Sequence, residues 1–110
     1  LGSASTTVLD IAVDTSSVYY AAGLIGAFAL DGSTNETLSS ASLPQGIATV
    51  ADNIYFFNGS SLSKIAKSGG DVSILALDTG PADHAVDDTS VYWTSGGADG
   101  VSGAVMKVAK

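Results

Sequence analysis

The sequence repeats one pattern of two apolar blocks three times along its 110 residues. In each copy a short block, mostly aliphatic, is followed seven positions later by a β-branched residue and two aromatic residues. The copies are 36 and then 37 residues apart, and they begin at Ile11, Ile47 and His84. Because the spacing inside the copies is constant, the repeat favours an architecture of similar units packed side by side.

Each copy is expected to contain four short β-strands. The two apolar blocks favour strands, and the polar residues between them, such as 15–17, are typical of hairpin turns. A third extended segment is predicted at 27–30, 63–66 and 106–109, and a fourth at 37–41 and 73–77. Four strands per unit is the strand count of a propeller blade, so we predict an all-β propeller fragment of three four-stranded blades with repeats of 36–43 residues.

The repeat also predicts how the chain is organised. We expect one domain, residues 1–110, with units at 8–43, 44–80 and 81–110 and with 1–7 as the closing outer strand of the last blade. The chain begins with Leu1, and we expect it to be a mature form or a piece of a longer protein. An arc of three blades would leave two apolar faces uncovered. We therefore expect either a homodimer that closes a six-bladed ring or the other half of a longer propeller chain.

The charge composition excludes two classes of partner. Eleven acidic residues stand against four lysines, which gives a net charge of −7. Binding to nucleic acid or to an anionic membrane needs a surplus of cationic side chains, so we expect neither. The lysines form two Lys-x-x-Lys pairs at one repeat position, at 64 and 67 and at 107 and 110. The chain has no cysteine, which excludes a disulfide framework and thiolate metal sites.

Two stretches carry a more specific motif. In the first copy an aromatic strand, VYY at 18–20, precedes ALDGS at 29–33, and in the third copy VYWT at 91–94 precedes MKV at 106–108. These stretches resemble the YWTD-type repeats of lipoprotein-receptor propellers and NHL-like bacterial propeller repeats, although the aspartate of YWTD is replaced by Ala22 or Ser95. The resemblance covers essentially the whole chain. It implies a propeller of about six blades with a binding role, and we expect an extracellular or periplasmic protein.

His84 is the one histidine, and it stands where the other copies have isoleucine. Next to Asp83 on the innermost strand, it could bind a ligand or a metal at the central channel. Alternatively it lines the channel and hydrogen-bonds a neighbour, because one histidine offers one imidazole ligand. No G-x-S-x-G nucleophile pattern is present, so we assign no catalytic residue.

Asp10 and Asp83 hold equivalent places just before the innermost strands, with Gly46 between them in the series. In a ring of two chains, four carboxylates would approach the channel mouth, where they could bind a hard cation such as calcium. The alternative is a pair of solvated loop acids, because no Asp-x-Asp-x-Asp-Gly calcium loop occurs. We assign no cofactor and no metal ligand.

The connection at 95–103 of the third copy is six residues longer than its counterpart in the second, and insertions in repeat arrays often fall on the binding face. It should share a face with the loops of Asp10, Gln45 and Asp83. The aromatic columns are expected to pack between blades, with Trp93 or Phe57 as an exception that could stack on a sugar. The candidate ligand-binding residues are therefore Asp10, Gln45, Asp83, His84, Trp93 and Asp99.

Taken together, these patterns predict a non-enzymatic binding or scaffold module that recognises a protein or a glycan through the face bearing the 95–103 loop. The alternative is a propeller-type enzyme, a lyase or a hydrolase, with a channel site around His84 and Asp83.

Overall fold

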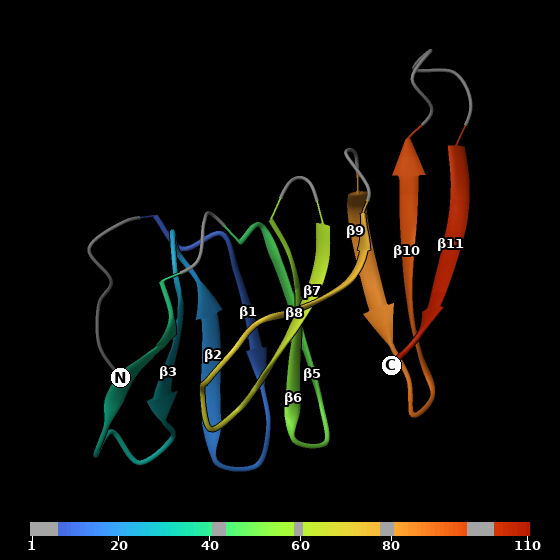
Figure 1. Ribbon diagram of the computed structural model, residues 1–110. Helices are drawn as coiled ribbons and strands as arrows, with labels where there is room; N and C mark the ends of the chain where they lie inside the picture. Colours follow the sequence, from blue (N-terminus) through green and yellow to red (C-terminus); the bar gives the residue numbers. More distant parts are fainter. Residues whose placement is uncertain (1–6, 41–43, 59–60, 78–80, 97–102) are drawn as a thin grey trace.

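The computed structural model describes residues 7–40, 44–58, 61–77, 81–96 and 103–110 (Figure 1). In this part of the chain eleven strands form three antiparallel sheets, which stand side by side as blades. Blade 1 contains β1 (Asp10–Val13), β2 (Ser17–Ala21), β3 (Ile25–Ala29) and β4 (Asn35–Ser39). Blade 2 contains β5 (Gly46–Val50), β6 (Asn53–Phe57), β7 (Ser61–Ala66) and β8 (Ser73–Leu77). Blade 3 contains β9 (Pro81–Val86), β10 (Ser90–Gly96) and β11 (Gly103–Ala109).

The all-β prediction is confirmed for the described residues, where every regular element is a strand. The strands of each sheet follow one another in chain order, so each blade is a simple up-and-down meander. The first strand of blade 2, β5, lies between β1 and β9, which places the first strands of the three blades next to one another. A search of the described residues finds no helix that could span a membrane.

The third strand of each blade begins two or three residues earlier than we predicted from the sequence, at Ile25, Ser61 and Gly103. The reason is that the second and third strands pair along their full length, as Ala21 with Ile25 in blade 1 and Gly96 with Gly103 in blade 3. Residues 95–96 and 103, at the two ends of the predicted 95–103 loop, therefore belong to β10 and β11. Residues 97–102 lie outside the described residues. The predicted closing strand at 1–7 also lies outside them, apart from Thr7, which is not in a strand.

Two apolar clusters fill the spaces between neighbouring blades. The alternation of side chains along a strand sends Ile54 and Phe56 toward blade 1 and Tyr55 and Phe57 toward blade 3. The first cluster joins blades 1 and 2 and contains Tyr19, Ala21, Ile25, Ala27, Leu38, Ile47, Ile54, Phe56 and Ile65. The second joins blades 2 and 3 and contains Tyr55, Phe57, Leu62, Val91 and Trp93. Blade 2 is thus apolar on both faces, as a blade inside a propeller must be.

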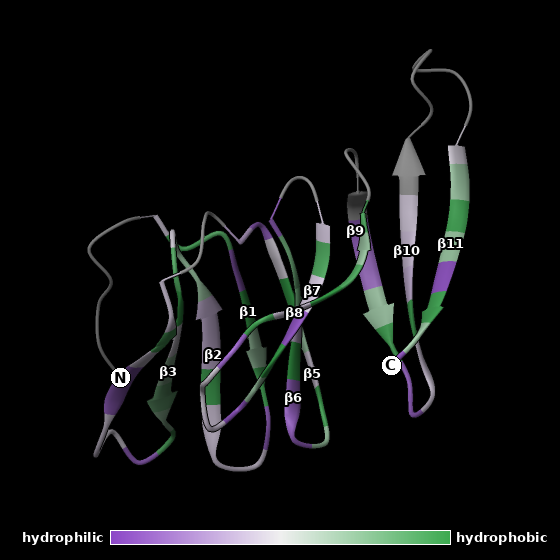
Figure 2. Cartoon of the chain, viewed as in Figure 1, coloured by the Kyte–Doolittle hydropathy of each residue, from purple (hydrophilic) through white to green (hydrophobic). Residues whose placement is uncertain are grey.

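The two ends of the array present apolar side chains to solvent. On blade 1, Ile11 and Val13 are exposed, and on blade 3, Val105 is exposed. Figure 2 shows the hydrophobic stretch of β11 at the edge of the molecule. The prediction that three blades leave two uncovered faces therefore holds in this structure of a single chain.

Candidate functional site

A cavity of about 220 Å³ lies where the first strands of the three blades begin. Four of the six predicted site residues line it together with Leu9, Gly46 and Phe57: Asp10, Gln45, Asp83 and His84. They converge because Asp10 and Gln45 stand at or just before the start of β1 and β5, Asp83 and His84 lie within β9, and these three strands are neighbours. Asp83 was expected just before its strand, but β9 begins two residues earlier, at Pro81. The structure therefore brings this part of the candidate site together from three separate repeats.

Asp10 connects blade 1 to blade 2. Its Oδ2 accepts a hydrogen bond of 3.0 Å from the backbone N–H of Ile47, and its Oδ1 accepts one of 2.9 Å from the N–H of Ile11. Both carboxylate oxygens are thus engaged by the backbone at the cavity wall. Asp10 therefore positions β5 beside β1. This role is more specific than that of the solvated loop acid considered from the sequence.

His84 packs across the cavity onto blade 2. A Cβ atom placed on Gly46 would lie 2.9 Å from the Cε1 atom of His84, so the ring can approach because this position is glycine. The ring of Phe57 meets the imidazole edge to face at a centroid distance of 5.0 Å. The Nε2 atom is buried and has no hydrogen-bond partner among the described residues. His84 is therefore enclosed by neighbours on the blade 2 side.

Burial lowers the pKa of His84, because an imidazolium cation loses hydration there. The negative charges of Asp10 and Asp83 and a hydrogen bond with the backbone of Ile47 oppose that effect without reversing it. The ring is consequently neutral at pH 7. A neutral, enclosed imidazole serves packing and hydrogen bonding rather than the binding of an anion.

Asp83 and Gln45 are the exposed polar groups of the cavity. The Oδ1 atom of Asp83 accepts a hydrogen bond of 2.8 Å from the backbone N–H of His84, and the N–H of Gln45 donates to the carbonyl of Phe57 at 2.7 Å. Their backbones are fixed while their side chains face solvent. Among the described residues, no group of three or more His, Cys, Asp or Glu side chains is arranged to hold a metal ion.

The structure places the other two predicted residues elsewhere. Trp93 is 4% exposed and packs against Phe57 at a ring centroid distance of 6.2 Å, inside the cluster between blades 2 and 3. It is thus a core residue like its repeat equivalents, and no exception. Asp99 lies outside the described residues. Leu9 and Gly46 line the cavity and were not predicted as site residues, although Gly46 occupies the position of Asp10 and Asp83 in its own repeat. Phe57, the alternative to Trp93 in the sequence analysis, lines the cavity as well.

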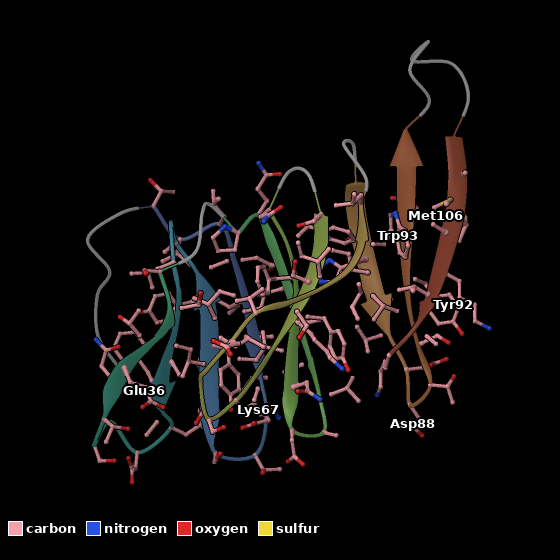
Figure 3. All side chains as sticks on the ribbon, in the orientation of Figure 1. Glu36, Lys67, Asp88, Tyr92, Trp93 and Met106 are labelled. Atoms are coloured by element: carbon pink, nitrogen blue, oxygen red, sulfur yellow. The ribbon has the colours of Figure 1, made fainter. Side chains whose placement is uncertain are left out.

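A second polar arrangement, which the sequence analysis did not foresee, joins blades 1 and 2 at the opposite end. The Nζ atom of Lys67, directly after β7, lies 2.8 Å from Oδ2 of Asp14 and 5.6 Å from the ring centroid of Tyr19. The hydroxyl of Tyr19 donates to the same oxygen at 2.9 Å. Figure 3 labels Lys67 near the turn between β1 and β2, where this contact forms. The repeated lysine pairs were the sequence signal for it.

The comparisons with known proteins concern the fold. No protein-family model matches the sequence, and no curated protein matches it either. Among solved structures, a chain in the crystal structure of a nidogen/laminin complex matches with a TM-score of 0.74 and 18% identity, over 91% of this chain and 48% of that chain. The crystal structure of the computationally designed Ika4 protein matches with a TM-score of 0.48 and 12% identity, over 96% and 94%.

The first of these matches supports the propeller fold that the resemblance of the repeats implied. This chain spans about half the length of that nidogen/laminin chain.

Proposed function

We propose that this chain is a non-enzymatic binding module of the propeller type, and that it recognises a protein through the end of the array where β1, β5 and β9 begin. The observation that carries the proposal is the cavity of about 220 Å³ at that end, where the second and third repeats contribute the exposed side chains of Gln45 and Asp83 and the first repeat contributes the partly buried Asp10. The similar structure in a nidogen/laminin complex belongs to an assembly of two proteins, which supports a protein partner over a glycan. A location outside the cytoplasm is part of the proposal.

The rival function, a channel enzyme built on His84 and Asp83, is less well supported by the geometry. The Nε2 atom of His84 is buried, and its ring is enclosed by Gly46 and Phe57. A general base must reach the proton it removes, within a hydrogen bond or through one water. An enclosed imidazole nitrogen cannot do so unless the blades move apart.

We also propose that further blades cover the two outer faces and complete a ring of six. These blades come from a second copy of the chain or from the rest of a longer protein. Light scattering across a dilution series distinguishes the two sources. A mass twice the 10.9 kDa of one chain that persists on dilution supports a closed homodimer, whereas a mass of 10.9 kDa at every concentration overturns the homodimer and leaves a longer protein as the proposed source of the blades.

The binding end is tested by capture with variants that place a lysine in the cavity. The immobilised chain is exposed to extracellular proteins from its source, and bound proteins are identified by mass spectrometry. Asp83→Lys and Gln45→Lys change exposed side chains of the cavity, and we expect each to reduce capture of a given partner at least tenfold. Asp52→Lys, at the exposed β5–β6 turn of the opposite end, is the matched control and should retain capture.

Either of two results would overturn the protein-binding proposal. One is a captured protein whose retention is the same for the cavity variants and for Asp52→Lys. The other is dose-dependent binding to a glycan array that depends on Asp83 or Gln45, because that result assigns the same end to a carbohydrate.

A further inference from the structure

The contact between Lys67, Asp14 and Tyr19, here called the latch, shows how one blade fastens to the next. Asp14 prepares the acceptor side, because its Oδ1 also accepts the backbone N–H groups of Ser16 and Ser17 and so fixes the turn after β1. The side chains of Lys67 and Asp14 are only 20% and 21% exposed, so the pair is partly shielded from solvent. Blade 2 supplies the cation, and blade 1 supplies the carboxylate and the ring.

The cation half of the latch recurs between blades 2 and 3. Lys110, directly after β11, lies over the ring of Tyr55 at 5.9 Å, just as Lys67 lies over Tyr19. The carboxylate is missing there, because Val50 replaces Asp14 in the repeat, and Lys110 donates instead to the backbone carbonyl of Asp87 at 2.9 Å. The approach of a lysine to the tyrosine of the preceding blade is thus a regular feature of this stacking.

Blade 3 carries the acceptor half of the latch on its outer face. The Oδ1 atom of Asp87 accepts the backbone N–H groups of Thr89 and Ser90, both at 2.8 Å, and its Oδ2 accepts the hydroxyl of Tyr92 at 3.0 Å. This repeats the arrangement of Asp14 and Tyr19. Figure 3 shows Tyr92 on the side of the array that faces away from blades 1 and 2. Within the described residues no lysine of another blade approaches this pair.

Two lysines of blade 3 itself lie near this pair: Lys110, which donates to the backbone carbonyl of Asp87, and Lys107, whose Nζ atom is 5.8 Å from the ring centroid of Tyr92. Lys107 is the cross-strand partner of Tyr92 in the same sheet. Lys64 holds the equivalent place beside Tyr55, where Lys110 also approaches. Tyr55 of blade 2 therefore has Lys64 of its own sheet beside it and Lys110 of blade 3 over its ring. By the same arrangement, Lys107 beside Tyr92 leaves room for a lysine of a further blade.

A hollow of about 210 Å³ accompanies the acceptor pair, with Ala85, Tyr92, Thr94 and Val105 in its lining. The first three are the repeat equivalents of Ala12, Tyr19 and Ala21. Those residues of blade 1 pack against apolar side chains of blade 2, among them Ile54 and Phe56. The hollow is thus the place where the second strand of a following blade would insert an apolar side chain.

We propose that the outer face of blade 3 is a docking surface for a propeller blade that carries a lysine directly after its third strand. That lysine pairs with Asp87 and Tyr92, and an apolar side chain of its second strand fills the hollow. The inference rests on the proposed completion of the ring and names the chemistry of the blade that comes next.

An unaltered second copy of this chain does not meet that requirement. Its first blade carries Leu30 directly after β3, at the position of Lys67 and Lys110. Docking of that blade would remove solvent from the carboxylate of Asp87 and place a leucine beside it, which leaves a charge without a counterion. Two chains with a net charge of −7 each also repel one another.

The variant Leu30→Lys converts the chain into a probe for this surface. Leu30 is exposed, so a lysine is tolerated in the single chain. We expect Leu30→Lys to associate with itself about fivefold more tightly than the wild type and the uncharged control Leu30→Met, because a partly buried ion pair is gained. Sedimentation equilibrium measures the dissociation constants, and urea unfolding verifies that every variant is folded.

The gain must depend on the acceptor pair. Asp87→Asn keeps an oxygen for the turn but removes the charge, and in the Leu30→Lys background it should abolish the gain. Asp88→Asn, at an exposed neighbouring acid, should leave the gain intact. The inference is overturned when Leu30→Lys associates no more tightly than Leu30→Met, or when the gain survives Asp87→Asn. If the wild type dimerises and Leu30→Lys does not dimerise more tightly, the proposed lysine contact is overturned. The proposed completion of the ring is then unaffected.

Discussion

At the scale of single residues, Asp14 and Asp87 show how one side chain can serve a turn and an interface at once. The pKa of Asp14 is held well below its ordinary value, mainly by the hydrogen bond from Lys67 of the next blade. The pKa of Asp87 is lowered to about 2, mainly by the backbone N–H groups of Thr89 and Ser90 in its own turn. Both carboxylates are ionised near neutral pH, but among the described residues only that of Asp14 forms an ion pair with a lysine.

Replacement of Lys67 by methionine tests the value of the latch within the chain. Lys67→Met removes the ion pair with Asp14 and the cation–π contact with Tyr19, and we expect it to lower the free energy of unfolding by about 1 kcal/mol in urea titrations. Lys110→Met is the matched control and should cost less, because Lys110 has the cation–π contact with Tyr55 and a backbone carbonyl partner but no carboxylate. Equal losses for both variants would show that the carboxylate contributes nothing.

The same contact predicts how stability depends on pH. The folded state lowers the pKa of Asp14 below the ordinary 3.8, so it binds a proton less tightly than the unfolded state does. The stabilisation is therefore complete above pH 3.8 and is lost as the pH falls toward the lowered value. We expect the loss of unfolding free energy between pH 6 and pH 3 to be smaller in Lys67→Met than in the wild type. Parallel curves for the two proteins would contradict this assignment.

At the scale of single strands, the pairing of β2 with β3 depends on one glycine. Tyr20 lies opposite Gly26 and stacks on Phe28 with ring centroids 5.2 Å apart. A Cβ atom on Gly26 would lie 2.3 Å from Cζ of the Tyr20 ring, which is closer than any real contact. The glycine thus lets the tyrosine cover its own strand pair on the outer face of blade 1.

Gly26→Ala should therefore displace Tyr20 from its stack on Phe28. We expect a loss of about 1–3 kcal/mol in unfolding free energy, the usual cost of overpacking. In a Tyr20→Leu background, where the clashing ring atoms are absent, the same substitution should cost markedly less. Urea titration of the four proteins closes this cycle, and an equal cost in both backgrounds would mean that the ring is not what the alanine meets.

The first two strands of each blade were predictable because they follow from local periodicity. The spacing of seven between the apolar blocks predicted the three hairpins, and the start of each innermost strand predicted Asp10, Gln45, Asp83 and His84 as neighbours. The face that Trp93 occupies depends on strand pairing, and the latch joins Asp14 to Lys67 across 53 positions. Contacts of this kind arise from the stacking of blades, which one sequence does not specify.

At the scale of the whole molecule, the repeat allows an outer face to be compared with an inner one. Ile11 and Ile47 are equivalent, yet Ile11 is 62% exposed and Ile47 is 4% exposed. The difference arises only because blade 2 has a neighbour on that side and blade 1 has none in this chain. Val18, only partly buried in blade 1, likewise corresponds to Ile54, which is buried against blade 1. The outer face of blade 1 therefore has the composition of an interface.

This pair of isoleucines provides a test of whether the outer face is covered. In a dilute solution of single chains, Ile47→Ala should cost about 2–5 kcal/mol of unfolding free energy, whereas Ile11→Ala should cost less than about 0.5 kcal/mol. When a further blade covers the face of blade 1, Ile11 becomes buried and the cost of Ile11→Ala should rise toward that of Ile47→Ala. Urea unfolding at low and at high protein concentration measures both costs. The opposite result is an equal cost for Ile11→Ala and Ile47→Ala at the lowest protein concentration. It would show that the outer face of blade 1 is covered even in the single chain, and that the blades do not pack as a side-by-side array.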